Sequence, residues 1–156
     1  MKRILFVCHG NICRSTMAQF VFQHLAGQQG RGGEFYVDSA ATSTEELGNP
    51  VHPGTRRKLA QVGIPCGEHR ARQLRREEYD KFDLLIGMDD ANLRNMRRML
   101  GGDPEGKIHG LLEYAGRPGQ SIADPWYTGN FNETYEDVLA GCQGLLERLK
   151  AAFPLR

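Results

Sequence analysis

Short apolar runs alternate with longer amphipathic stretches along this chain, and the alternation strongly restricts its fold. The runs that predict buried strands are residues 4–7, 35–37 and 84–86, with a weaker run at 107–109. The stretches that predict helices are residues 17–25, 53–62, 89–100 and 131–150. Strands that alternate with helices favour an α/β sandwich around a mostly parallel sheet.

Length and charge restrict the protein class further. A chain of 156 residues predicts one domain that spans residues 1–156. Lys and Arg number 20 against 19 Asp and Glu, so the net charge of +1 gives no electrostatic reason to bind nucleic acid or a membrane. The N-terminal apolar run is too short for a signal peptide, and the four cysteines lack zinc-like spacing. We therefore expect a cytoplasmic protein with reduced thiols.

The segment "CHGNICRS" lies between the first predicted strand and the first predicted helix. Such a junction offers converging backbone N–H groups and the positive end of a helix dipole. Gly10 and Asn11 tolerate the unusual φ angles that a loop curled around an anion needs. Arg14 adds a planar fork suited to two phosphate oxygens. The segment predicts a phosphate-binding loop made of His9, Gly10, Asn11, Ile12, Cys13, Arg14 and Ser15.

The same positive field would act on the thiol of Cys8. An ordinary cysteine is only a few per cent thiolate at neutral pH. A positive charge at ~4 Å contributes on the order of 1–4 kcal/mol, which suffices to make Cys8 mostly thiolate. The hydroxyl of Ser15 could add a hydrogen bond to the sulfur. We therefore predict that Cys8 is a nucleophile beneath a bound phosphorus atom.

Displacing an aryloxide from phosphorus also requires an acid that protonates it, worth about 10²–10⁴ in rate. The segment "SIADPWYTGNF" offers a candidate on a loop. Asp124 precedes Pro125, which stiffens the backbone, and Trp126 and Tyr127 could flank a substrate that carries an aromatic ring. We therefore predict that Asp124 is this acid.

The motifs "CHGNICRS" and "DPWY" resemble those of low-molecular-weight protein tyrosine phosphatases. The resemblance covers most of the chain through "VDSAATS", "LGNP", "HRARQL" and "FDLLIGMDDANL". It implies a flavodoxin-like three-layer sandwich, in which helices cover both faces of a four-stranded parallel sheet. It also implies hydrolysis of phosphotyrosine proteins or aryl phosphates through a phosphocysteine, without metal or cofactor. Inorganic phosphate or a similar oxyanion should bind the loop of a monomer or weak dimer.

The resemblance also implies roles for individual residues. Cys8 would be the nucleophile, Arg14 the phosphate clamp, and Asp124 first the acid and then the base that activates water. The residues matched to support of the loop are Asn11, Ser15, Ser39 and His69, and those of the pocket wall are Ile12, Glu45, Trp126 and Tyr127. Cys13 could form a reversible disulfide with Cys8, because a curled loop can bring their α-carbons within the ~7 Å that a disulfide allows.

Three positions depart from the family pattern. Thr16 replaces the usual proline, so we expect a looser joint between loop and helix. His9 stands where an uncharged residue is commoner, and it is either a rim residue that tunes substrate choice or an exposed spectator. Glu45 stands where many relatives carry an aromatic residue, and it should repel acidic peptides that flank a phosphotyrosine.

Three other functions compete with this interpretation. Arsenate reductases of related fold need two further cysteines near the end of the third strand, where this chain has none. Arginine phosphatases carry threonine in place of Ile12, and an apolar Ile12 favours an aryl phosphate. A catalytically silent module that binds phosphate or phosphopeptides would need neither Cys8 as nucleophile nor Asp124 as acid.

Overall fold

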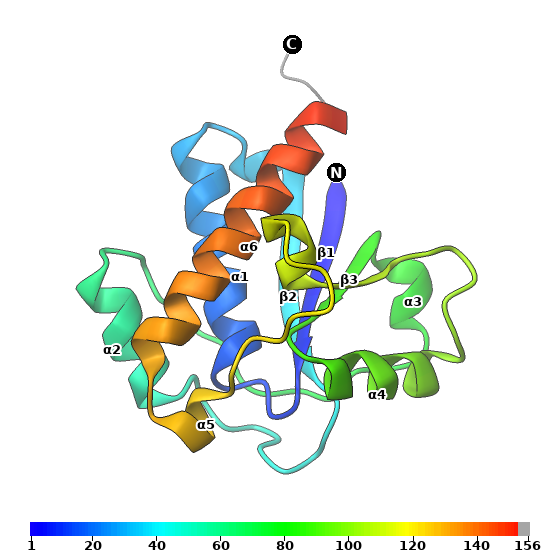
Figure 1. The fold of residues 1–156 in the computed structure, drawn as a ribbon, viewed down its shortest axis with the longest axis horizontal. Helices are drawn as coiled ribbons and strands as arrows, with labels where there is room; N and C mark the ends of the chain where they lie inside the picture. Colours follow the sequence, from blue (N-terminus) through cyan, green and yellow to red (C-terminus); the bar gives the residue numbers. More distant parts are fainter. Residues whose placement is uncertain (153–156) are drawn as a thin grey trace.

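Four parallel strands form one sheet at the centre of the protein. The computed structural model describes residues 1–152. Strands β1 (Lys2–Cys8), β2 (Phe35–Ala41), β3 (Leu84–Gly87) and β4 (Ile108–Gly110) pair in the order β2-β1-β3-β4 (Figure 1). Each predicted strand is present, and β2 continues to Ala41, beyond its predicted end at residue 37.

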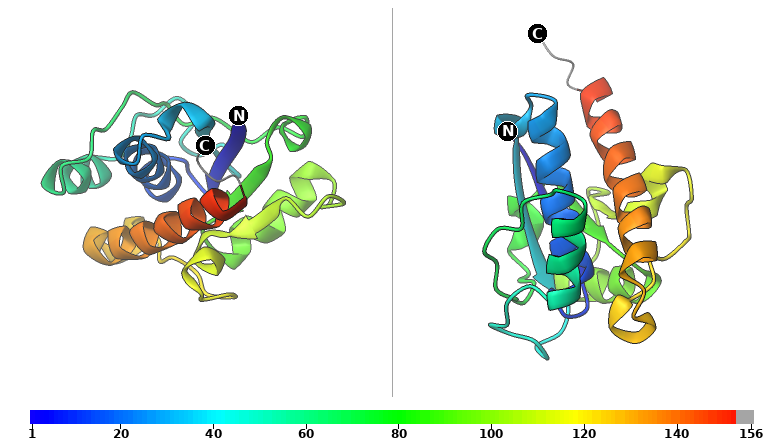
Figure 2. Two further views of the ribbon diagram at one scale, coloured as in Figure 1. Left: turned by 90° about the horizontal axis from the view of Figure 1, so that it is seen from above. Right: turned by 90° about the vertical axis from the view of Figure 1, so that its left-hand side faces the viewer.

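The alternation of side chains along β1 explains the three layers. Ile4 and Phe6 pack into the core beneath α1 (Arg14–Gln28) and α6 (Phe131–Ala152). Leu5 and Val7 point to the other face, where they pack with residues of α3 (Glu78–Lys81) and α4 (Asp90–Leu100). All four β1 side chains are fully buried, as expected for a central parallel strand. The predicted three-layer sandwich with helices on both faces is confirmed (Figure 2).

The remaining elements connect the layers. Helix α2 (Pro53–Gln61) packs against α1 and α6, and the short helix α5 (Pro125–Thr128) precedes α6. Two 3₁₀ turns, η1 (Gly32–Glu34) and η2 (Leu111–Ala115), lie before β2 and after β4. Helix α6 touches η2 so closely that a Cβ atom on Gly144 would overlap the carbonyl oxygen of Tyr114.

The parallel arrangement brings the carboxyl ends of all four strands to one edge of the sheet. The chain passes from β1 to β2 on one side and later pairs β3 on the other side, so β1 borders a topological switch point, where ligands bind in such folds. The start of α1 and helix α5 both lie at this edge (Figure 1). Within residues 1–152, the helices are too short or too polar to cross a lipid bilayer.

Candidate active site

The loop of residues 9–13 curls between β1 and α1. Among the described residues, Asn11 is the one non-glycine residue with a positive φ, at 59°. Its backbone N–H donates to Cys8 Sγ at 3.3 Å. Gly10 does not adopt the positive φ that we predicted, and a close approach restricts this position instead. A Cβ atom on Gly10 would lie 3.3 Å from Cγ of Glu46.

Asn11 fixes the loop from behind. Its amide nitrogen donates to Ser15 Oγ at 2.8 Å, and its amide oxygen accepts from His69 Nε2 at 2.8 Å and from the Arg72 backbone N–H at 3.2 Å. Because the Asn11 amide already donates to Ser15, the hydroxyl proton of Ser15 is free to point at Cys8 Sγ, 3.0 Å away. That direction is the one that stabilises a thiolate.

A second layer of contacts holds His69. Ser39 Oγ lies 3.2 Å from His69 Nε2 and donates to Gln19 at 2.6 Å. Asp38 lies 3.8 Å from His69 Nδ1 and pairs with Arg72 at 2.9 Å. Burial lowers the pKa of His69; the charge of Asp38 opposes this effect and that of Arg72 adds to it. His69 is therefore a neutral imidazole that donates from Nε2. Ser39 and His69 support the loop without lining the pocket.

Arg14 lies at the base of the pocket with 2% of its surface exposed. Its Nη1 donates to Asp89 at 2.6 Å and to the Ile122 carbonyl at 3.0 Å, and its Nη2 lies 3.4 Å from Asp124. Burial alone would lower the pKa of Arg14. The negative charge of a Cys8 thiolate and the hydrogen bond to Asp89 outweigh burial, so the pKa is raised overall. Arg14 is therefore a permanent cation.

Asp89 was missed as part of the site by sequence reasoning, which placed it only at the start of the predicted helix 89–100. It does cap α4, because its carboxylate accepts from the Asn92 backbone N–H at 2.7 Å. Its other oxygen meets Arg14. One feature of the sequence could have placed Asp89 in the site. It directly follows β3, and the carboxyl ends of parallel strands share one edge of the sheet.

Asp124 occupies a more defined position than the predicted loop. It is the N-cap of α5, where one carboxylate oxygen accepts from the Trp126 backbone N–H at 3.0 Å and the other faces Arg14. A cap of this kind fixes the direction of the side chain. The carboxylate is thereby aimed at the base of the pocket.

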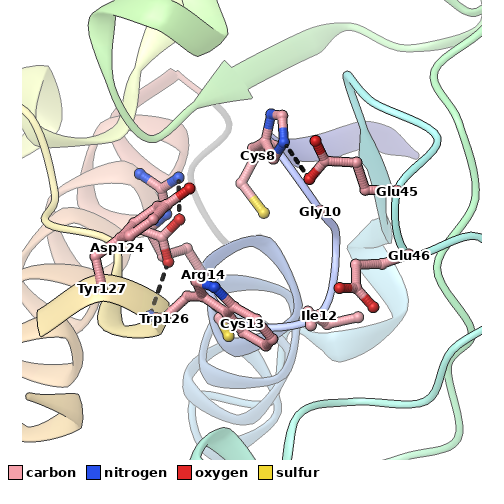
Figure 3. A pocket seen from close by; sticks show the side chains of 11 residues that line it. Cys8, Gly10, Ile12, Cys13, Arg14, Glu45, Glu46, Asp124, Trp126 and Tyr127 are labelled. Atoms are coloured by element: carbon pink, nitrogen blue, oxygen red, sulfur yellow. Dashed lines mark hydrogen bonds and ion pairs between the residues drawn. The ribbon is translucent and has the colours of Figure 1, made fainter. Parts of the chain in front are cut away.

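A cavity of about 90 Å³ brings most of the predicted residues together. Several waters, or one tetrahedral anion, fit a space of this size. Glu45 and Glu46 lie on one side of it, and Asp124, Trp126 and Tyr127 lie on the other (Figure 3). The lining residues are Cys8, His9, Gly10, Ile12, Cys13, Arg14, Glu45, Glu46, Asp124, Trp126 and Tyr127. Glu46 was not predicted to belong to this pocket.

His9 and Glu45, two of the departures from the family pattern, contact each other. His9 Nε2 lies 2.9 Å from a carboxylate oxygen of Glu45. The side chains are 45% and 69% exposed, so this contact contributes about 0–1 kcal/mol. His9 is therefore an exposed partner of Glu45 on the pocket rim, and whether it tunes substrate choice stays a prediction.

Thr16 does not loosen the joint between loop and helix, contrary to expectation. Its side chain is fully buried. The hydroxyl donates to the Ile12 carbonyl at 2.9 Å and shares its proton with the Cys13 carbonyl at 3.1 Å. Two hydrogen bonds therefore tie the first turn of α1 to the loop.

Cys13 is a buried thiol that lines the same pocket as Cys8. Burial raises the pKa of Cys13 to about 12, and the charges of Cys8 and Asp124 add to this effect. Cys13 is therefore protonated at neutral pH. Within residues 1–152, the structure contains no cluster of three or more His, Cys, Asp or Glu side chains that could hold a metal ion.

Comparisons with known proteins agree with this geometry. Residues 3–154 match the family described as low molecular weight phosphotyrosine protein phosphatase. The chain is 39% identical over 151 residues to the low molecular weight protein-tyrosine-phosphatase YfkJ of Bacillus subtilis, covering 96% of this chain and 97% of that protein. The human low molecular weight phosphotyrosine protein phosphatase is 37% identical and covers 94% of this chain, which spans 95% of the human protein.

Solved structures give the same result. The crystal structure of YfkJ superimposes with a TM-score of 0.93 at 38% identity, covering 98% of this chain and 97% of that chain. A Drosophila arginine phosphatase superimposes with a TM-score of 0.86 at 30% identity, covering 96% of this chain and 98% of that chain.

Proposed function

The chain belongs to the low molecular weight phosphotyrosine protein phosphatase family and is a phosphatase; from this premise we propose that Cys8, Arg14 and Asp124 hydrolyse phosphotyrosine and aryl phosphates. One observation carries the proposal. The Cys8 thiol, the Arg14 guanidinium and the Asp124 carboxylate line one cavity, although Arg14 and Asp124 lie 110 residues apart in sequence. A nucleophile, a buried cation and an oriented carboxyl group are the parts that phosphoryl transfer through a covalent intermediate needs.

In the first step, the Cys8 thiolate attacks phosphorus while the bond to the aryl oxygen breaks. The loop N–H groups and Arg14 stabilise the three equatorial oxygens. Asp124 carries a proton at this stage and gives it to the leaving oxygen. The products of the step are the free phenol and a phosphocysteine.

In the second step, water attacks the phosphocysteine. Asp124, now a carboxylate, takes a proton from the water as the new P–O bond forms and the P–S bond breaks. The hydrogen bond from Ser15 stabilises the departing Cys8 thiolate. Inorganic phosphate then leaves the loop.

The first test compares para-nitrophenyl phosphate with a phosphotyrosine peptide in metal-free buffer. Cys8→Ser should be inactive on both, because the alcohol lacks the nucleophilicity of a thiolate. Asp124→Asn should lose about 10²–10⁴ in rate on the peptide and less on para-nitrophenyl phosphate, whose leaving group needs little protonation. If the wild type binds phosphate without turnover, the chain is a binding module instead.

The likeness to an arginine phosphatase supports a second candidate function, hydrolysis of phosphoarginine. The side chain that lines the pocket at position 12 is the apolar Ile12, which favours an aryl ring. We therefore propose that phosphotyrosine is the better substrate. A higher kcat/KM on a phosphoarginine peptide than on the matched phosphotyrosine peptide would reverse this assignment.

Glu45 and Glu46 form an acidic lip on the rim opposite Trp126 and Tyr127 (Figure 3). We propose that this lip disfavours acidic peptides. A phosphotyrosine peptide flanked by lysines should have a kcat/KM about 2- to 10-fold higher than its glutamate counterpart, as exposed charge pairs allow. Glu45→Gln and Glu46→Gln should each reduce that ratio. An unchanged ratio in both variants would show that the lip does not select substrates.

We also propose that Cys13 protects Cys8 from irreversible oxidation. Peroxide converts the Cys8 thiolate to a sulfenic acid, and attack by Cys13 then forms the disulfide and releases water. Because the pKa of Cys13 is raised to about 12, its thiolate fraction grows about tenfold per pH unit below that value. Disulfide formation, followed by mass spectrometry, should therefore accelerate as pH rises. Sulfonic acid at Cys8 without a linked peptide would contradict this role.

Four finer points stay predictions. We propose that residues 1–156 act as one domain and that the protein is a monomer or weak dimer, as the resemblance to the family implies. We also keep the predicted cytoplasmic location. Inorganic phosphate, the product, is the anion that we expect in the loop.

A further inference from the structure

The carbonyl groups of Ile12 and Cys13 are bonded from outside the pocket. The Ile12 carbonyl accepts from the His52 backbone N–H at 3.0 Å and from Thr16 Oγ1 at 2.9 Å. The Cys13 carbonyl accepts from the Met17 backbone N–H at 3.2 Å, as the first hydrogen bond of α1, and from Thr16 Oγ1 and Thr55 Oγ1, each at 3.1 Å. His52, Thr16 and Thr55 do not belong to the pocket lining. Both threonines are fully buried, so bulk water cannot take their place.

These contacts set the direction of the amides that face the anion. In a planar trans peptide unit, the C=O and N–H groups point in opposite directions. When the Ile12 carbonyl is held pointing away from the pocket, the Cys13 N–H must point into it. In the same way, the outward direction of the Cys13 carbonyl makes the Arg14 N–H point into the pocket. A carbonyl dipole turned toward a bound dianion would repel it, whereas successive inward N–H groups form an anion nest.

We propose that Thr16, assisted by Thr55, is a positioning residue of the phosphate-binding loop, whose hydroxyl holds two consecutive carbonyls away from the anion. The inference rests on the proposed phosphatase function, because it concerns the same bound phosphoryl group. One hydroxyl bridges adjacent carbonyls, so the Thr16 side chain joins two peptide groups that the backbone N–H groups of His52 and Met17 hold one at a time. Thr55 reaches the second carbonyl from α2, which ties the loop to a neighbouring helix.

The test replaces the hydroxyl without changing the shape of the side chain. Thr16→Val should lower kcat/KM on para-nitrophenyl phosphate by about 10- to 100-fold, as misplaced catalytic groups do. It should also raise the inhibition constant of inorganic phosphate. Thr16→Ser keeps the hydroxyl and should restore both constants to near the wild-type values.

A matched control removes a buried hydroxyl that contributes no bond. The hydroxyl of Thr42 has no hydrogen-bond partner within the described part of the chain, and the residue is 8% exposed. Thr42→Val should therefore keep the wild-type kinetic constants. Melting temperatures of all variants separate loss of fold from loss of positioning.

Two outcomes would overturn the inference. One is a folded Thr16→Val enzyme with unchanged kcat, KM and phosphate inhibition, even if its melting temperature falls. The other outcome concerns Thr55→Val, the variant that tests the proposal if Thr16→Val does not fold. Thr55→Val should bind phosphate more weakly than the wild type. Unchanged phosphate binding would contradict the proposal. If the wild type shows no turnover, the phosphatase proposal fails by itself, and phosphate binding measured by calorimetry still tests the positioning role.

Discussion

Arg14 receives its position from three separate parts of the chain. Asp89 follows β3, Ile122 offers a backbone carbonyl, and Asp124 caps α5. A planar guanidinium held by several acceptors keeps one orientation and presents its remaining N–H groups in a fixed direction. At the scale of the residue, the orientation of Arg14, the proposed phosphate clamp, therefore depends on Asp89.

Two substitutions at position 89 separate charge from capping. Asp89→Asn keeps a capping oxygen but loses the charge that pairs with Arg14, and Asp89→Ala loses both. Each should raise KM and the phosphate inhibition constant. Because Asp89 is 24% exposed, losing its charge should cost less than the ~3–5 kcal/mol of fully buried pairs. The free energy of unfolding, measured with urea, should be about 1 kcal/mol lower for Asp89→Ala than for Asp89→Asn, because only Asp89→Ala loses the cap.

The contrast between the two variants is the control. Equal unfolding free energies for Asp89→Asn and Asp89→Ala would mean that the cap is irrelevant. Wild-type kinetics in Asp89→Asn would show that the charge of Asp89 does not position Arg14.

At the scale of the element, glycines in helices mark where packing is tightest. Gly144→Ala should destabilise the protein by about 1–3 kcal/mol, because the added methyl group meets the Tyr114 carbonyl of η2. Gly27→Ala is the matched substitution in α1, where no atom lies within 4 Å of the new Cβ. It should stabilise the protein by about 0.5–1 kcal/mol. Urea unfolding measures both, and a neutral Gly144→Ala would mean that α6 moves freely against η2.

Sequence patterns predicted the long elements and the chemistry of the loop, and they missed short elements and distant contacts. Helices α3 and α5 have four residues each, which is too few for an apolar periodicity to be visible. The pairs Asp89–Arg14 and His9–Glu45 join residues 75 and 36 positions apart, so no local pattern indicates them. The role of Thr16 was misjudged for a different reason: its partners Ile12 and Cys13 are close in sequence, but their carbonyls reach its hydroxyl only once the loop is folded.

At the scale of the whole molecule, two histidines link stability to pH. Burial lowers the pKa of His52 and of His69. The unfolded chain therefore binds more protons than the folded protein between the lowered values and the ordinary value of 6.5. The contribution of the two neutral histidines to the free energy of unfolding is complete above pH 6.5 and decreases as the pH falls below this value.

Urea unfolding at several pH values between about 5 and 8 tests this linkage. The unfolding free energy of the wild type should decrease toward acid. His69→Gln keeps an N–H donor for Asn11 but cannot titrate, so its profile should be flatter. A profile parallel to that of the wild type would mean that His69 does not contribute to the acid sensitivity.

The position of β1 has a consequence for synthesis on the ribosome. The central strand β1 and Cys8, the proposed nucleophile, emerge before β2 and β3, the neighbours on both sides of β1, have been made. Arg14 meets Asp124 only after 110 further residues have been added. A nascent chain therefore exposes the four apolar residues of β1 during most of translation, a state in which chaperones protect such segments from aggregation. Competence for phosphoryl transfer is thus acquired late in synthesis, after β1 has paired with β2 and β3 and Arg14 has met Asp124.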